Sequence, residues 1–168
     1  GGTQRLPRLV GIEQAAVMTS LGEPISAQKA LDTGLIDKLA GEDSLAADAV
    51  AFARECVAKG PRHPRDLPVK GDTAIIAKLE AANARKWKGF DAPYANLRCV
   101  AAAAENPNIE DGLKFERAEF MKLMTGSQSA AQRHMFFAER QAAKIDGLPK
   151  DTQLRDIKKV GVIGAGTM

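Results

Sequence analysis

A glycine motif near the end of the chain contains the residue types that most clearly indicate chemistry. Residues 160–166 read Val-Gly-Val-Ile-Gly-Ala-Gly, so an apolar run leads into Gly164 and Gly166. Glycines at this spacing after a strand are typical of a dinucleotide-binding turn. The first permits the tight turn, and the second lets the backbone approach a pyrophosphate. An ordinary glycine loop is the alternative. The third glycine, the following helix and the ribose-binding acid of such a site are missing from residues 1–168, so we expect that these residues alone cannot hold a dinucleotide.

A basic loop is a second candidate for chemistry. Lys59, Arg62, His63 and Arg65 lie close together around Gly60-Pro61, and their side chains could contact the phosphate groups of a ligand. A solvated basic loop is the alternative that we favour. His63 has no acidic partner nearby in the sequence, so we do not propose it as a catalytic base.

Composition limits the classes of protein that the chain can represent. Of 168 residues, 45% are hydrophobic, which is ordinary for a globular protein, and the net charge of +3 is too small to indicate a nucleic-acid partner. No apolar run approaches the roughly 20 residues of a membrane span, and no signal peptide is visible. Cys56 and Cys99 lack metal-ligand spacing, so we predict no metal site and expect reduced, buried cysteines in a reducing compartment.

The two ends of the chain suggest that it belongs to a longer protein. The sequence begins at Gly1-Gly2 without an initiator methionine, and it stops at Met168 inside the glycine motif. A natural domain rarely begins or ends at such positions. We therefore expect the parent protein to extend beyond both ends.

The pattern of apolar residues predicts a mainly α structure. Glycine, proline and capping residues divide it into helices near 12–21, 27–33, 45–59, 73–87, 94–105, 109–125 and 127–144. Short strands are expected only near 35–39 and 160–163. In the helix over 109–125, the side chains expected to face inward are Leu113, Phe120, Leu123 and Met124.

The first third of the chain resembles a known superfamily. Gly1-Gly2-Thr3-Gln4-Arg5-Leu6, followed by Arg8-Leu9-Val10-Gly11, resembles the crotonase superfamily just after its second catalytic region. The later pattern of Ile25-Ser26-Ala27, Ala30 and Gly34-Leu35-Ile36-Asp37 is similar to the continuation of that family. Ser20-Leu21-Gly22 stands where the family often has Thr-Gly directly. The resemblance covers roughly residues 1–60.

Two further segments resemble a multifunctional enzyme of fatty-acid β-oxidation. The segment 110–140 is similar to the helix that links the hydratase to the dehydrogenase, and residues 160–168 are similar to the opening of a 3-hydroxyacyl-CoA dehydrogenase domain. The three matches occur in the order that such enzymes have. The resemblance then implies NAD contacts from Ile163, Gly164, Ala165, Gly166, Thr167 and Met168.

The linking helix implies substrate contacts as well. In that family it lies over the hydratase active site, so Phe136, Phe137 and Glu139 become candidates to line the acyl-CoA site, with plain core packing as the alternative for the phenylalanines. Adjacent helical residues point about 100° apart, so one ring should face the ligand and the other the core. Glu139 shares the face of Phe136, and we favour Phe136 and Glu139 as the ligand-side pair.

The resemblance implies a division of the chain and a two-step reaction. Residues 1–60 would be the C-terminal helical part of a crotonase fold, 61–109 a helical extension, 110–144 linker helices and 145–168 the first β-strand and glycine turn of a Rossmann domain. The parent would hydrate trans-2-enoyl-CoA to 3-hydroxyacyl-CoA and oxidise it with NAD to 3-ketoacyl-CoA. Both sets of catalytic residues would lie outside residues 1–168, so no catalytic residue is assigned, Glu13 and Glu23 included, and residues 1–168 alone are predicted to be inactive.

The expected partners and the alternatives follow from the same resemblance. Coenzyme A thioesters are the substrates, and a thiolase subunit and further copies of the chain are candidate partners. A bacterial cytoplasm is favoured over a peroxisome. A non-catalytic helical assembly module and a monofunctional enoyl-CoA hydratase or isomerase are the alternatives. The glycine motif after residue 158 argues against the second, because such enzymes end before it.

Overall fold

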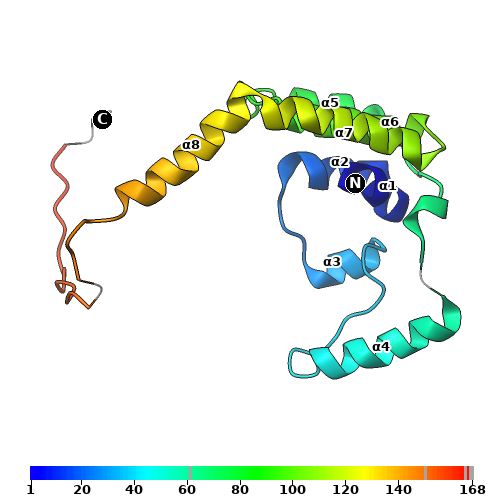
Figure 1. The fold of residues 1–168 in the computed structure, drawn as a ribbon, viewed down its shortest axis with the longest axis horizontal. Coiled ribbons are helices and arrows are strands. Elements are labelled where there is room, and N and C mark those ends of the chain that lie inside the picture. The colour runs from blue at the N-terminus through cyan, green and yellow to red at the C-terminus, as the bar shows by residue number, and fades with distance from the viewer. Residues whose placement is uncertain (61, 150, 165, 167–168) are drawn as a thin grey trace. The chain divides into compact units, whose positions relative to one another are not determined.

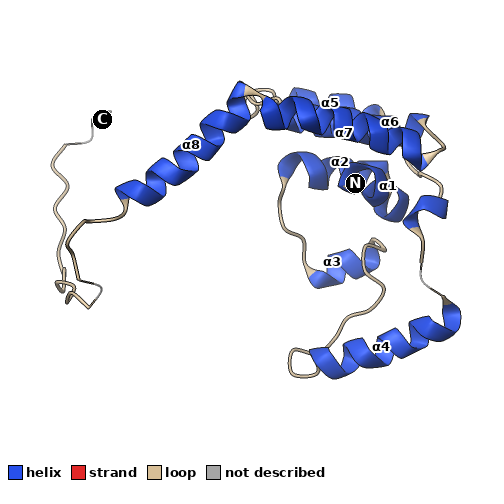
Figure 2. Ribbon diagram, in the orientation of Figure 1, coloured by secondary structure: helices blue, strands red, loops and turns tan. Residues whose placement is uncertain are grey.

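The computed structural model describes residues 1–60, 62–149, 151–164 and 166. Along these residues the chain is helical and contains no strand (Figure 1), as Figure 2 shows by colour. The elements are α1 (Gly2–Val10), α2 (Ile12–Leu21), α3 (Ala27–Asp32), α4 (Leu45–Lys59), the 3-10 helix η1 (Pro64–Asp66), α5 (Ala74–Asn83), α6 (Ala92–Glu105), α7 (Ile109–Thr125) and α8 (Ser127–Ala142). The mainly α prediction is confirmed. The chain divides into two compact units, one from Gly1 to Ala130 and one from Ala131 onward.

The core of the first unit is built on small residues of α2 and α6. Ala15 and Ala16 are completely buried in a cluster with Leu97, Val100 and Trp87. Alanine side chains let two helix backbones approach closely, so the helices pack with few voids. Helix α2 contacts α1 and α6, and α6 in turn packs on α7.

Local signals set several helix ends where the sequence predicts them. Helix α2 stops at Gly22, whose φ of 68° is left-handed and suits glycine. The hydroxyl of Ser26 accepts a hydrogen bond from the amide of Lys29 at the start of α3. The side chain of Asn108 accepts one from the amide of Glu110 at the start of α7. Each of these caps pairs groups two to four residues apart, so the neighbouring sequence suffices to form it.

The two segments expected to be strands are not strands. After α3, the amides of Leu35 and Ile36 both donate to the carbonyl of Ala30, so residues 35–36 close the helix end instead of extending. Val160, Val162 and Ile163 are 82%, 86% and 102% exposed. A strand is stable only when its backbone pairs with a neighbour, and the described residues supply no neighbour.

The buried face of α7 differs from the predicted one. Ile109, Gly112 and Glu119 are buried, whereas Phe120 is 54% and Met124 39% exposed. The predictions for Phe120 and Met124 are therefore wrong, while Leu113 and Leu123 are half-buried. The buried stripe follows Gly112 and Glu119 because polar contacts to α1 and α6, and not apolar burial alone, orient this helix.

The second unit consists of most of α8 and the segment that follows it. No residue of α8 is buried, and residues 145–149, 151–164 and 166 form no helix or strand. Among the helices of the described residues, none has the length and apolarity that crossing a membrane requires.

Candidate functional site

A cavity opens where the start of α1 meets α6 and α7. Its volume is about 260 Å³, and its walls are more apolar than polar. Lining residues are Gly2, Thr3, Thr19, Ala95, Asn96, Cys99, Glu116, Glu119, Phe120 and Leu123. This cavity was not foreseen from the sequence. The spacing of Glu116, Glu119 and Leu123 along one helical stripe was the signal that could have indicated it.

Glu116 of α7 is hydrogen-bonded to the start of α1. The hydroxyl of Thr3 donates to Oε2 of Glu116 at 2.6 Å. The carboxylate side chain is 17% exposed. This contact links α7 to α1 at the mouth of the cavity.

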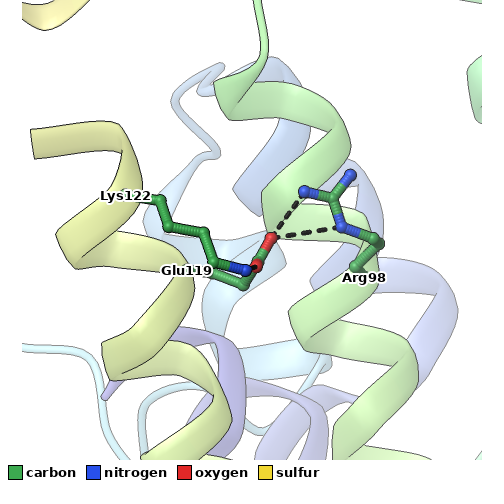
Figure 3. A network of polar contacts seen from close by, with 3 residues as sticks. All are labelled: Arg98, Glu119 and Lys122. Atoms are coloured by element: carbon green, nitrogen blue, oxygen red, sulfur yellow. Dashed lines mark hydrogen bonds and ion pairs between the residues drawn. The ribbon is translucent and has the colours of Figure 1, made fainter. Parts of the chain in front are cut away.

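Glu119 is the centre of a network between α6 and α7 (Figure 3). Nη2 and Nε of Arg98 donate to its Oε2 at 2.5 and 3.2 Å, and Nζ of Lys122 donates to its Oε1 at 2.7 Å. The hydrogen bond from Lys122 and then those from Arg98 hold the pKa of Glu119 below its ordinary value. A carboxylate that keeps its charge in this way is a poor general base, and its contacts join α6 to α7.

Cys99 contributes a thiol to the cavity wall. It is 3% exposed and unpaired, and burial, followed by the charge of Glu119, raises the pKa of its thiol. The thiol therefore stays neutral and acts as a small apolar group, as predicted, whereas Cys56 is only half-buried. With its carboxylates hydrogen-bonded to other side chains and a neutral thiol in its wall, the cavity is suited to bind an apolar group.

The predicted substrate residues lie on α8 in the second unit. Phe136 and Phe137 are 48% and 64% exposed, and their rings stand nearly perpendicular with centroids 5.3 Å apart. The guanidinium of Arg140 lies 3.8 Å from the Phe136 centroid. Phe137 lines an open hollow on α8 together with His134, Arg140 and Lys144. Glu139 is exposed and does not line this hollow.

The basic loop is largely occupied by contacts within the protein. Arg62 donates to the carbonyls of Gly34 and Leu35 and pairs with Asp37 at 3.2 Å. Arg65 pairs with Glu110 at 3.2 Å. These contacts favour the structural interpretation of the loop over a phosphate-binding one for Arg62. In the part of the chain that the structure describes, no group of acidic, histidine or cysteine residues could hold a metal ion.

The described part of the glycine motif does not form a dinucleotide cradle. Gly164 has a φ of 91°, which suits a turn, but no atom outside its neighbours lies within 4 Å of the position a Cβ would take. Ile163 is fully exposed. Ala165, Thr167 and Met168 lie outside the described residues. The NAD contacts of Ile163, Gly164 and Gly166 stay a prediction.

Comparison with known proteins assigns the family. The family model of enoyl-CoA hydratase/isomerase matches residues 1–97, which include α1, α2 and the first part of α6. The chain belongs to the enoyl-CoA hydratase/isomerase family. Within this family segment lie Gly2, Thr3 and Ala95 of the cavity, while Glu116 and Glu119 lie beyond residue 97.

Similar proteins extend the match over the whole chain. It is 36% identical over 177 aligned positions to the "Peroxisomal bifunctional enzyme" of Danio rerio, covering 100% of the chain and 24% of that protein. The human protein of the same name is 34% identical, covering 99% and 24%. The "Fatty acid oxidation complex subunit alpha" of Shewanella loihica is 32% identical, covering 100% and 25%.

These relatives bear on several expectations. The resemblance to multifunctional enzymes of fatty-acid β-oxidation is confirmed. The chain spans about a quarter of the length of the curated relatives that it matches. Both peroxisomal and bacterial proteins occur among them, so the compartment stays a prediction for this member of the enoyl-CoA hydratase/isomerase family.

Proposed function

We propose that the protein to which these residues belong hydrates trans-2-enoyl-CoA thioesters and oxidises the resulting 3-hydroxyacyl-CoA with NAD. The observation that carries the proposal is the match of residues 1–97 to the enoyl-CoA hydratase/isomerase family. The glycine motif at residues 160–168 and the relatives named as bifunctional enzymes support the second step. Hydration requires acid and base groups and a pair of donors for the enolate, and we assign neither to residues 1–168.

The cavity at the start of α1 is proposed to take the acyl chain of the thioester. Its apolar walls suit hydrocarbon, and its two carboxylates are held by partners within the protein. Phe120 and Leu123 would then contact the acyl chain, because both line the cavity and neither is fully buried. Glu116 and Glu119 would hold α1, α6 and α7 in place around the acyl chain.

Helix α8 is proposed, independently of this cavity, to contact an acyl-CoA. Phe136, Phe137 and Glu139 remain the substrate-side candidates, with Phe136 and Glu139 preferred on helical spacing. The hollow beside Phe137 carries His134, Arg140 and Lys144, and this cationic and aromatic lining suits a phosphate-bearing nucleotide. A thiolase subunit and further copies of the chain stay the proposed partners.

One comparison tests the proposed activity directly. Residues 1–168 alone and the longer protein that contains them are assayed with crotonyl-CoA, and with 3-hydroxybutyryl-CoA plus NAD. We expect turnover of both substrates only by the longer protein. If residues 1–168 turn over substrate even after Glu13 and Glu23 are replaced, a catalytic site lies within residues 1–168. An inactive longer protein would contradict the proposed function.

A pair of variants tests the acyl-chain role of the cavity in the longer protein. Phe120→Ala should change KM for a long-chain enoyl-CoA more than for crotonyl-CoA, because only the long chain reaches the ring. Phe115→Ala is the matched control, since Phe115 lies on the same helix, is 39% exposed and does not line the cavity. Equal effects of the two variants on both substrates would contradict this role.

A further inference from the structure

Arg8 of α1 is a buried cation whose contacts are all to main-chain carbonyls. It is 6% exposed. Its Nη1 donates to the carbonyl of Gln4 at 3.2 Å, and its Nη2 donates to those of Asn106 and Pro107, both at 3.3 Å. Its Nε is buried and has no hydrogen-bond partner. None of the ion pairs found among the described residues includes Arg8.

This arrangement leaves a positive charge that is only partly balanced. A guanidinium carries five N–H donors, and three carbonyl contacts do not use all of them. The carbonyls of Asn106 and Pro107 follow the C-terminus of α6, where the helix dipole contributes a partial negative charge. A buried charge is normally paired with a full opposite charge. Burial lowers the pKa of Arg8, which reflects the same lack of compensation.

A cavity of about 370 Å³ adjoins Arg8 and carries a second arginine on its wall. That residue, Arg65, belongs to η1 and is 60% exposed, with Glu110 as its ion-pair partner. Asp66 supplies the one carboxylate among the lining residues. Because Arg65 already pairs with Glu110, Arg8 is the cation of the cavity wall that takes part in none of the ion pairs found among the described residues.

The rest of the cavity wall is suited to an organic group. Leu67, Val69 and Ala103 are apolar lining residues. A volume of about 370 Å³ falls at the lower end of the roughly 300–1,000 Å³ of small-molecule sites. A bare anion would leave much of that volume and its apolar wall unused.

We propose that this cavity binds a small phosphorylated organic molecule, with its phosphate group between Arg8 and Arg65 and its organic part against Leu67, Val69 and Ala103. Phosphate offers several acceptors to two guanidinium groups, and arginine is the side chain best suited to it. The site lies between α1, η1 and the end of α6, whereas the acyl cavity lies at the start of α1 near Glu116 and Glu119. The proposal goes beyond the proposed enzymatic function and does not depend on it.

Isothermal titration calorimetry on the 168-residue chain tests the site with two probes, inorganic phosphate and phenyl phosphate, at constant ionic strength set with chloride. Phenyl phosphate should bind with a stoichiometry of one and more tightly than inorganic phosphate. Arg65→Gln should raise the Kd for phenyl phosphate about tenfold or more, because a charge-assisted contact is lost. Arg65 is exposed, so this variant should fold. Arg8→Lys, checked by circular dichroism, should weaken binding as well, since lysine lacks the planar fork.

Arg85→Gln is the matched control, because Arg85 is exposed and does not line the cavity. The Kd of this variant for phenyl phosphate should equal that of the unmodified chain. An absence of phenyl phosphate binding, or equal weakening by Arg65→Gln and Arg85→Gln, would overturn the proposal. Equal affinity for the two probes would overturn the organic part of the ligand and identify the site as one for free phosphate.

Discussion

Oε2 of Glu119 lies 2.5 Å from Nη2 of Arg98, and this contact joins α7 to α6 (Figure 3). The two side chains differ in their access to water, since that of Glu119 is 8% exposed and that of Arg98 is 54% exposed. Glu119 therefore depends on its partners for hydrogen bonds, while Arg98 can also be hydrated. The carboxylate is the member of the pair whose removal or protonation has the larger consequence.

Stability should fall in acid partly because of Glu119. Its pKa in the folded chain lies below the ordinary value of 4.5, so the unfolded chain takes up the proton first as the pH decreases. The stabilisation from this carboxylate is complete when the pH lies above the ordinary pKa of 4.5. It is lost as the pH falls through the lower pKa of the folded chain. Urea unfolding from about pH 6 to about pH 3 measures it. Glu119→Gln should cost about 1–2 kcal/mol at neutral pH and flatten this part of the profile; an unchanged acid slope in the variant would contradict the assignment.

Gly112→Ala should destabilise the first unit. A Cβ at Gly112 would overlap Oε1 of Gln4, and Gln4 is fully buried with its Nε2 bound to the carbonyl of Cys99 at 2.6 Å. The overpacking should cost about 1–3 kcal/mol and outweigh the gain in helix propensity of about 1 kcal/mol. Thermal melts measure the difference. In a Gln4→Ala background the same change should be neutral or stabilising, and an identical cost in both backgrounds would show that the two residues do not interact.

Trp87→Ala should destabilise the first unit by about 3–5 kcal/mol, because it removes a large buried side chain. Trp87 is 4% exposed and meets the ring of Tyr94 edge to face with centroids 5.5 Å apart. Unfolding in urea is followed by circular dichroism, since the variant lacks the single tryptophan of the chain. Phe90→Ala is the control, because Phe90 is 47% exposed, and its cost should stay well below that of Trp87→Ala.

Truncating the phenylalanines of α8 should leave the 168-residue chain as stable as before. Phe136 and Phe137 are both exposed, so each change to alanine should shift the free energy of unfolding by no more than about 0.5 kcal/mol. In the longer protein, hydratase kinetics then separate the two. A raised KM for Phe136→Ala, with little change for Phe137→Ala, is expected from the preferred pairing of Phe136 with Glu139. The reverse pattern would assign the ligand side to Phe137 and the hollow that it lines.

Features that depend on neighbouring residues could be predicted from the sequence. The end of the helix predicted over 12–21 and the starts of those predicted over 27–33 and 109–125 occur at Gly22, after Ser26 and after Asn108. Each is a contact between groups a few residues apart, so its free energy is set by local sequence. The family is also visible in the sequence, because Gly1 to Leu6 and the residues after them keep an order typical of it.

Contacts between distant segments were decided only by the tertiary structure. Thr3 and Glu116 are 113 positions apart, and Gln4 meets Gly112 only because α1 crosses α7. The hydrophobic pattern placed Phe120 inside, but it does not include the polar contacts of Glu116 and Glu119 that turn α7 the other way. Residues 160–163 have the composition of a strand, yet a strand exists only when another segment pairs with its backbone.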